Sequence, residues 1–444
     1  MNWCILHFFT VMQNTLFWFR RDLRLEDNAG LYHALKSGKQ VIPVFIFDKN
    51  ILDDLEDKAD KRVQFIHLQI TNIHQQLQGL GSSLVVKYGN PIQVLQQLIE
   101  DYKIKDIYIN EDYEPYAIKR DEQVNQLLSV KGGKLHSCKD QVIFEKQEVV
   151  KDDGLPYTVF TPYSKKWKAK LSPFYLKAYA SSKYFNSFSK AHSVGIIPSL
   201  AFMGFHTSQV QFPATIANEN IITYYDTTRD YPAIHGTTQL SVHLRFGTIS
   251  IRGLAAIALA KNEKFLNELI WRDFYQQIIW HFPHVLNSCF RAEYNSIPWR
   301  NNETEFTAWC DGKTGYPIVD AGMRQLNATG WMHNRVRMVV ASYLTKHLLI
   351  DWRWGEAYFA KKLLDFDLAS NNGGWQWAAG CGVDAAPYFR IFNPRLQTEK
   401  FDKDLKYILH WIPELNSFDY PAPIVNHEEA RKRCLAAYKI GLNK

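Results

Sequence analysis

The sequence lacks the signatures of several common classes of protein. No apolar run approaches the roughly 20 residues that a membrane-spanning helix requires. Residues 1–11 are mildly apolar but have no basic segment and no cleavage motif, so they do not predict a signal peptide. The six cysteines are scattered and form no Cys-x-x-Cys pair, which argues against structural zinc and favours free thiols in a reducing, cytoplasmic compartment.

Motifs for phosphate binding and for hydrolysis are also missing. No G-x-G-x-x-G follows the first predicted strand, and Gly312-Lys-Thr314 lacks the earlier glycine of a P-loop. His427 is followed four positions later by Arg431, so the H-E-x-x-H spacing fails and no metal site is expected. No order of Ser, His and Asp predicts a hydrolase triad.

The composition is that of an ordinary soluble protein, with one departure. The 444 residues are 46% hydrophobic and 22% charged, and this length predicts two or three domains. A net charge of +7 is weakly compatible with a nucleic-acid partner. Ten of the 13 tryptophans lie between Trp271 and Trp411, a local density above what core filling usually requires.

Short apolar strands alternate with helices in the first third of the chain. Strands are expected at 16–19, 41–47, 84–88, 107–109 and 135–137, and helices at 29–36, 61–78, 91–101 and 116–129. Continuous apolar strands separated by helices predict a parallel sheet covered on both faces, in a Rossmann-like α/β domain.

The pattern changes after this domain. Residues 141–220 are rich in Tyr, Ser, Lys and Pro and predict a long linker with little regular structure. From residue 221 onward the pattern is helical, broken by Gly and Pro. The expected organisation is a disordered extension or upstream-start artefact at 1–13, an α/β domain at 14–140, the linker at 141–220 and an all-α domain at 221–444.

Three clusters in the helical region combine polar and aromatic side chains. Gly236-Thr-Thr-Gln-Leu-Ser241 offers hydroxyl and N–H groups beside a turn, which suits a phosphate or an ordinary helix cap equally well. Glu268, Trp271, Arg272 and Tyr275 share one helix face, which predicts either a pocket wall able to stack on a base or a half-buried, salt-bridged helix.

The third cluster is Gly330–Met338. Asn334 and Met338 are four residues apart and share a helix face, with Arg335 and Arg337 beside them. Asp365 and Asp367 are candidate counter-charges for these arginines.

The most unusual stretch is Asn371–Pro394, NNGGWQWAAGCGVDAAPYFRIFNP. Trp375 and Trp377 are two residues apart, so on a helix their indoles would point about 200° apart. Pattern alone favours a buried, Gly-rich helix junction with tryptophan as core filler.

Several long motifs, in order, resemble the DNA photolyase/cryptochrome family. They are Leu16-Phe-Trp-Phe-Arg-Arg-Asp-Leu-Arg-Leu-Glu-Asp-Asn28, Arg229-Asp-Tyr-Pro-Ala233, Gly330-Trp-Met-His-Asn-Arg335, Asn371–Pro394 and Asp419–Arg431. The resemblance covers the chain from about Asn14 to the C-terminus. It implies an α/β antenna domain and a helical domain that holds a U-shaped FAD.

The resemblance assigns a set of FAD-binding positions. They are Tyr225, Thr237, Thr238, Gln239, Leu240, Ser241, Arg337, Asp365, Phe366, Asp367 and Asn371. Asn371 matches the residue that faces flavin N5, where photolyases carry Asn. Trp375, Trp352 and Trp299 match the family's electron-transfer triad, which reduces FAD to the active FADH⁻ form in light.

The resemblance also implies a pocket for a flipped-out cyclobutane pyrimidine dimer in UV-damaged DNA. Its residues are Arg229, Glu268, Trp271, Arg272, Tyr275, Asn334, Arg335, Met338 and Trp377, with Gln397 and Lys400 at the rim. Trp271 and Trp377 would sandwich the two pyrimidines, and excited FADH⁻ would split the dimer by electron transfer.

Met338 and the Trp-Met-His-Asn sequence favour a class I cyclobutane-dimer photolyase over DASH-type cryptochromes and (6-4) enzymes. A monomeric, cytoplasmic, nucleoid-associated deoxyribodipyrimidine photo-lyase is therefore expected, and the chain stops at Lys444 without a signalling tail. The alternatives are a photosensory cryptochrome without repair activity and a plain flavoprotein.

The antenna chromophore is left open by the sequence. Asn110-Glu111 resembles a folate-contacting pair, but Asp48–Asp54 lacks the His expected of folate binders. A folate, a deazaflavin, a second flavin or an empty site all remain as hypotheses.

Overall fold

The computed structural model describes residues 13–190 and 195–443, which form two compact units. The α/β unit comprises Met1–Gln141, Lys177–Gln209 and Phe246–Ile251, and the helical unit comprises Val142–Leu176, Val210–Arg245 and Arg252–Lys444. The extension expected at residues 1–13 lies, except for its last residue, outside the described part of the chain.

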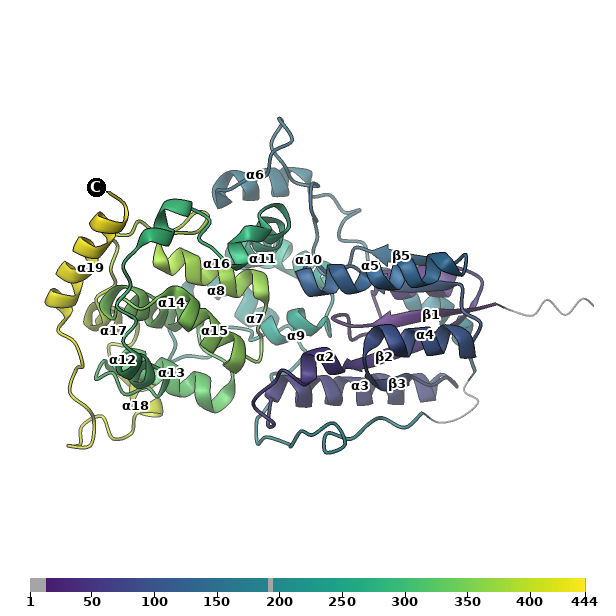
Figure 1. Cartoon of the computed structure of the whole chain (residues 1–444), viewed down its shortest axis with the longest axis horizontal. Helices are drawn as coiled ribbons and strands as arrows, with labels where there is room; N and C mark the ends of the chain where they lie inside the picture. Colours follow the sequence, from purple (N-terminus) through teal and green to yellow (C-terminus); the bar gives the residue numbers. More distant parts are fainter. Residues whose placement is uncertain (1–12, 191–194, 444) are drawn as a thin grey trace, which may run out of the picture. The chain divides into compact units, whose positions relative to one another are not determined.

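The α/β unit contains a parallel sheet, purple to blue in Figure 1. Its five strands lie in the order β3-β2-β1-β4-β5. The strands are β1 (Asn14–Phe19), β2 (Gln40–Asp48), β3 (Val85–Gly89), β4 (Asp106–Asn110) and β5 (Lys134–Cys138). The helices among them are α1 (Ala29–Lys36), α2 (Lys49–Leu52), α3 (Lys61–Gly79), α4 (Pro91–Asp101) and α5 (Pro115–Val130). The predicted strands and long helices are confirmed, and only the short α2 was not expected.

Helices cover both faces of this sheet, as the apolar strands predict. On one face, Leu16 and Trp18 of β1 share a buried cluster with residues of α4 and α5. On the opposite face, Gly30 of α1 lies against the ring of Phe17, where an added Cβ would come within 2.9 Å. Gly30 is therefore required for the close approach of α1 to the sheet.

The helical unit is built around one large apolar core that includes Trp309, Trp352 and Trp375. Its helices are α6 (Phe160–Lys170), α7 (Glu219–Thr223), α8 (Tyr225–Thr228), α9 (Ser241–Phe246), α10 (Ile251–Lys261), α11 (Glu263–His281), α12 (Glu303–Cys310), α13 (Pro317–Thr329), α14 (Asn334–Ser342), α15 (Trp352–Lys362), α16 (Leu368–Ala379), α17 (Pro394–Phe401), α18 (Lys406–Trp411) and α19 (His427–Gly441). A π-helical turn, Tyr343–His347, extends α14.

Helix α6 is the clearest departure from the expected linker. Its Tyr163 and Trp167 are fully buried, and the indole Nε1–H of Trp167 donates to the Asp273 carboxylate at 3.0 Å. Long-range burial stabilises a helix whose own sequence has weak periodicity. Lys177–Gln209, also within the expected linker, belongs to the α/β unit and contains a 3-10 helix, Ser181–Ser187.

Two features are absent from the described residues. No helix there is long and apolar enough to cross a membrane. No group of three or more His, Cys, Asp and Glu side chains in that part of the chain could hold a metal ion.

Candidate functional site

The loop before α9 presents donors that the protein itself does not use. Gly236 packs on Thr228 of α8 so closely that an added Cβ would come within 2.7 Å of the threonine side chain. The Thr228 hydroxyl donates to the Gly236 carbonyl at 3.1 Å, which fixes the start of the loop. In the described structure the backbone N–H groups of Thr237, Thr238 and Gln239 donate no hydrogen bond. A ligand rich in acceptor oxygens, such as a diphosphate, fits these donors.

Charged side chains around the start of α16 are held by one another. The Arg337 guanidinium pairs with the Asp365 carboxylate at 2.9 Å, as the sequence predicts for one of the two candidate aspartates. Asp367 instead caps α16 by accepting from the Ser370 N–H at 3.0 Å, and Arg245 lies 3.7 Å from its other oxygen. These contacts fix the positions of Asp365 and Asp367, and with them Phe366, which lies between the two in the sequence.

Asn371 lies in the first turn of α16, and only the nitrogen of its side-chain amide is hydrogen-bonded. Its Nδ2 donates to the Glu356 carbonyl at 3.1 Å, whereas its Oδ1 accepts no hydrogen bond within the described structure. The side chain is 8% exposed. A free amide oxygen in a nearly buried position fits a ligand that carries an N–H group, which is what flavin N5 offers once reduced.

The three tryptophans of the predicted electron chain differ in exposure. Trp375 and Trp352 are buried, and Trp299 is half-buried. Helix α15 packs directly on the Trp375 indole, because a Cβ added to Gly355 would lie 2.1 Å from that ring. Trp299 meets the Tyr438 ring edge-on at 5.9 Å between centroids. Of the three, only Trp299 is partly exposed, as the outer end of such a chain requires.

The residues predicted to contact the lesion include two linked ion pairs. Arg229 binds the Glu268 carboxylate, and Arg335 binds Asp230 at 2.7 Å. Burial raises the pKa of Glu268, although Arg229 and its hydrogen bond act in the opposite direction. The structure therefore brings Arg229, Glu268 and Arg335 into one polar cluster.

Contacts between α14 and α17 place further predicted residues together. The Arg335 guanidinium lies 4.4 Å over the Phe401 ring and donates to the Met338 sulfur at 3.8 Å. The Lys400 amine lies 5.2 Å from the same ring. Asn334 is exposed and Gln397 is half-buried on these two helices.

Trp271 has a partner that the sequence did not predict. The Phe160 ring stacks on the Trp271 indole with centroids 3.7 Å apart and planes 2° apart. One face of Trp271 is therefore covered by Phe160. Phe160 was missed because it begins α6, in the segment where periodicity fades.

The other members of the α11 face point to different neighbours. The Tyr275 ring packs on Gly373 of α16, where an added Cβ would come within 2.2 Å of the ring. Arg272 donates to the Leu244 carbonyl at 3.5 Å. Trp377 is half-buried and packs against the core of the helical unit. The shared face of α11 thus contacts both α9 and α16.

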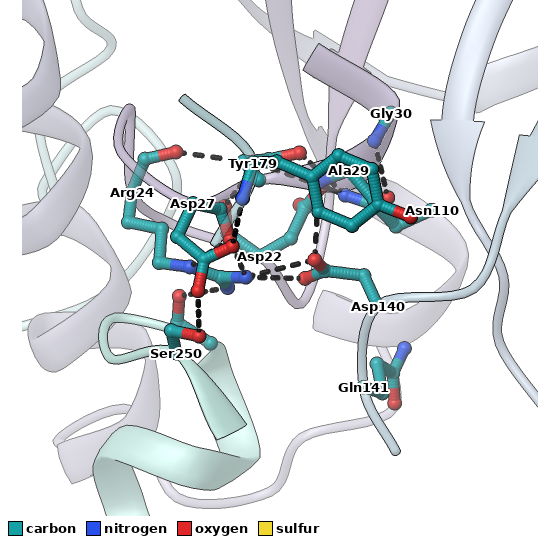
Figure 2. A network of polar contacts seen from close by, with 12 residues as sticks. Asp22, Arg24, Asp27, Ala29, Gly30, Asn110, Asp140, Gln141, Tyr179 and Ser250 are labelled. Carbon is teal, nitrogen blue, oxygen red and sulfur yellow. Dashed lines mark hydrogen bonds and ion pairs between the residues drawn. The ribbon is translucent and has the colours of Figure 1, made fainter. Parts of the chain in front are cut away.

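One antenna candidate, Asn110, is the last residue of β4 (Figure 2), and Glu111 follows it in the sequence. The Asn110 Nδ2 donates to Asp22 at 2.6 Å and to Asn28 at 2.7 Å, and its Oδ1 accepts from the Gly30 N–H at 2.7 Å. Since these bonds use the amide on both sides, Asn110 has a structural role. Its contact with a chromophore, and that of the half-buried Glu111, stays a prediction.

The same network continues through the α/β unit (Figure 2). Arg24 pairs with Asp140 at 2.7 Å, and Asp27 accepts from the Tyr179 N–H at 2.7 Å and from the Ser250 hydroxyl. These bonds join three separate stretches of sequence into one unit.

Comparison with known proteins identifies the family. The family model described as DNA photolyase matches residues 15–181, and the FAD binding domain of DNA photolyase matches residues 265–419. The deoxyribodipyrimidine photo-lyase of Synechococcus is 39% identical, with 95% of this chain and 96% of the relative covered. That of Escherichia coli is 37% identical, with 96% and 99% covered.

Solved structures agree with these matches. A class III photolyase from Agrobacterium tumefaciens has a TM-score of 0.87 and 32% identity, with 98% of both chains covered. A photolyase from Sulfolobus tokodaii with two FAD molecules has a TM-score of 0.81 and 36% identity, with 96% of this chain and all of that chain covered. A Synechocystis cryptochrome also has a TM-score of 0.81, but at 25% identity. The chain belongs to the DNA photolyase family.

Proposed function

We propose that this protein is a deoxyribodipyrimidine photo-lyase that uses light to split cyclobutane pyrimidine dimers in DNA. The observation that carries the proposal is the arrangement of α16. This helix places the nearly buried Asn371 amide, the buried Trp375 and the half-buried Trp377 within two turns. Helix α16 therefore holds both Trp375, the inner end of the proposed electron chain, and Trp377, an indole at the edge of the core.

The residues described above fit FAD as the cofactor. The unused N–H groups at Thr237 to Gln239 suit its phosphates, and the Arg337–Asp365 pair and the Asn371 amide suit its ring system. When bound and reduced, FAD supplies the light-driven electron. Asn371 would hold the N5–H group by accepting a hydrogen bond from it at Oδ1, which leaves the charge of the amide unchanged.

The tryptophans and the ion pairs then have separate roles. Trp375, Trp352 and Trp299 deliver electrons from the surface to the interior, which activates the enzyme. Trp271, backed by Phe160, offers one indole for stacking, and Trp377 offers a second. Arg229, Glu268 and Arg335 bind the polar edges of the extruded pyrimidines. Extrusion of a dimer costs less than extrusion of undamaged bases, because the damaged pair is poorly held in the duplex.

The class of photolyase and the assembly are also proposals. Met338 beside Arg335, and Asn334 in place of a second histidine, support a cyclobutane-dimer enzyme of class I. We propose that the protein acts as a monomer on DNA in the cytoplasm. Exposed cations such as Lys400 bind the backbone phosphates.

A gel-shift experiment tests this function. Reduced protein should shift UV-irradiated oligo(dT) in the dark and leave undamaged oligo(dT) unshifted at the same concentration. Blue light should then release the DNA, because a repaired strand no longer carries the lesion. Equal binding of both strands would indicate a plain flavoprotein. A shift that light does not reverse would favour a cryptochrome-type photoreceptor.

A further inference from the structure

Helices α11 and α16 carry Trp271 and Trp377, the two indoles that the proposed function assigns to stacking on a pyrimidine dimer. The two helices are in direct contact. A Cβ added to Gly373 of α16 would lie 2.2 Å from the Tyr275 ring of α11, so the glycine permits a close approach. Tyr275 is about one helical turn from Trp271, and Gly373 is about one turn from Trp377. This contact holds the two indole-bearing helices together.

A second connection joins the same two regions through helix α6. The Phe160 ring, at the start of α6, lies flat on the Trp271 indole with centroids 3.7 Å apart. The Phe160 N–H donates to the Asp384 carboxylate at 3.3 Å. Asp384 lies in the loop that follows α16, a short distance after Trp377 in the sequence. The bond therefore connects the residue behind Trp271 with the chain that leaves the helix of Trp377.

Asp384 acts as a helix cap from a distant part of the sequence. Phe160 is the first residue of α6, and its N–H is one of those that a helix leaves without a partner of its own. Val159, at the N-cap position, makes no side-chain bond to the helix. A carboxylate beside the first turn also interacts favourably with the helix dipole. Asp384 supplies what the local sequence of α6 lacks.

The backbone of Asp384 has a conformation that few residues adopt. Its φ is 45°, in the left-handed region, where most L-residues are strained and where Gly, Asn and Asp are tolerated best. Strain of this kind persists only where the surrounding structure requires it, and it is concentrated at functional sites. The conformation and the bond to Phe160 are two separate observations on one residue.

Other hydrogen bonds hold α6 on α11. The Trp167 Nε1–H donates to the Asp273 carboxylate at 3.0 Å, and the Gln277 amide donates to the Tyr157 carbonyl at 2.8 Å. In the described part of the chain, the bond to Asp384 is the one hydrogen bond that connects residues 157–170 with the chain after α16. Without it, α6 would follow α11 alone.

We propose that Asp384 sets the distance between the two indoles and is a positioning residue for the recognition of a pyrimidine dimer. The proposal rests on the lesion pocket of the proposed function. A cyclobutane dimer is a rigid ligand, so stacking on both Trp271 and Trp377 requires a gap of fixed width. The Gly373 contact brings the helices together, and the Asp384 bond holds Trp271, through Phe160, in a fixed place relative to the end of α16.

The proposal predicts an effect on damaged DNA only. Contacts with phosphates do not depend on the gap between the indoles, and they account for most of the affinity for an intact strand. A change in the gap should therefore lower the affinity for the dimer and leave the affinity for intact DNA as it is. Asp384 then contributes to specificity although it is not required to touch the lesion.

Two variants of Asp384 separate its hydrogen bond from its charge and its backbone. Asp384→Gly removes the acceptor and tolerates the positive φ. Asp384→Asn removes the charge as well, but it keeps an acceptor oxygen and also tolerates this φ. The dissociation constants of the FAD-loaded protein for UV-irradiated and for intact oligo(dT) are measured in the dark. The absorption spectrum of bound FAD confirms that each variant is folded and loaded.

The glycine variant should lose affinity for the lesion. We expect Asp384→Gly to bind the irradiated strand roughly three- to tenfold more weakly than Asp384→Asn, a part of the loss expected when a base no longer stacks on an aromatic ring. Both variants should bind the intact strand equally well, because each lacks the charge. Asp384→Asn should bind the irradiated strand almost as tightly as the wild type.

A double variant tests whether Asp384 acts through Phe160. In Phe160→Ala the ring that Asp384 positions is gone, so adding Asp384→Gly should weaken binding to the irradiated strand little further. Losses that add fully would overturn the proposal, because Asp384 would then act by another route.

The remaining outcomes separate this proposal from the proposed function. If Asp384→Gly binds the irradiated strand as tightly as Asp384→Asn, or loses affinity for both strands alike, the positioning role is overturned while the preference of the wild type for damaged DNA stands. If the wild type itself binds both strands equally, the proposed function is wrong and the positioning role fails with it.

Discussion

Single residues in this protein have distinct roles that their neighbours define. Trp375 and Trp377 share one helix, yet Trp375 is buried against Gly355 and Trp377 is half-buried. Sequence spacing predicted that the two indoles diverge. The resemblance to a family assigned their roles, because spacing does not reveal which side faces a cofactor.

The outermost tryptophan should matter for activation and not for repair. Trp299→Phe should slow photoreduction, because phenylalanine does not replace indole as an electron donor. Repair by chemically reduced protein should stay near the wild-type rate. The two rates are followed by flavin absorbance and by the loss of dimers in irradiated DNA. Equal loss of both activities would contradict the separation of activation from repair.

The Trp271–Phe160 stack should contribute to the affinity for damaged DNA. Trp271→Ala should cost about 1–3 kcal/mol of binding, the usual worth of base stacking on an aromatic ring. Phe160→Ala should lose a part of this binding energy. The Trp271 indole would no longer be held by the Phe160 ring, whose centroid lies 3.7 Å away. Phe174→Ala is the control, since Phe174 is 77% exposed in the same region. Unchanged affinity in Trp271→Ala would remove this residue from the site.

At the scale of elements, local sequence signals predicted some helices correctly. They missed a helix whose stability depends on long-range packing. Helix α1 has the predicted bounds because Asn28 caps it, accepting from the Leu31 N–H at 3.0 Å. Helix α6 was not predicted, because its stability depends on the burial of Trp167 far from its own neighbours in sequence.

The packing of α15 on α16 should tolerate no added methyl group. Gly355→Ala should destabilise the protein by about 1–3 kcal/mol, because its Cβ would lie 2.1 Å from the Trp375 indole. Gly374→Ala is the matched control on α16, where a Cβ meets nothing within 4 Å. It should be neutral or stabilising by up to about 1 kcal/mol. Urea unfolding of both variants measures this, and a reversed order would contradict the packing.

The cap of α14 should make stability depend on pH. The neutral His333 ring accepts from the Arg335 N–H at 3.2 Å, and burial lowers the pKa of His333 to about 4. Between an ordinary histidine pKa of about 6.5 and about 4, the unfolded chain therefore binds a proton that the folded chain does not. The free energy of unfolding should fall as pH falls through this window, by up to about 3 kcal/mol from this residue.

His333→Asn tests this origin of the pH dependence. Asparagine keeps a capping oxygen without titrating, so the decline in stability between neutral pH and mildly acid pH should become shallower. Unfolding in urea at the two pH values gives the comparison. An unchanged decline would assign the effect to other buried groups, such as His347, whose pKa burial lowers to about 3.

At the scale of the whole molecule, contacts between cationic side chains and DNA phosphates should make the affinity for DNA depend on salt. Affinity for damaged oligonucleotides should fall linearly on a log–log plot against salt concentration. Lys400→Ala should weaken binding to damaged and intact DNA alike and lower the slope by about one unit. A selective loss for damaged DNA would place Lys400 in the lesion pocket instead.

The order of strands and helices could be predicted across the α/β unit because buried parallel strands give uninterrupted apolar runs. The pairing of Arg337 with Asp365 could also be proposed from charge alone. The position of Phe160 against Trp271 could not, because no local pattern encodes a contact between α6 and α11.

Light-dependent repair is the most direct test of the central claim. Chemically reduced protein is mixed with UV-irradiated oligo(dT), and the ultraviolet absorbance of thymine is followed in blue light and in the dark. The proposed function predicts that absorbance recovers in light over many turnovers and stays constant in the dark. No recovery in light, from protein that holds reduced FAD and binds the damaged strand, would contradict it.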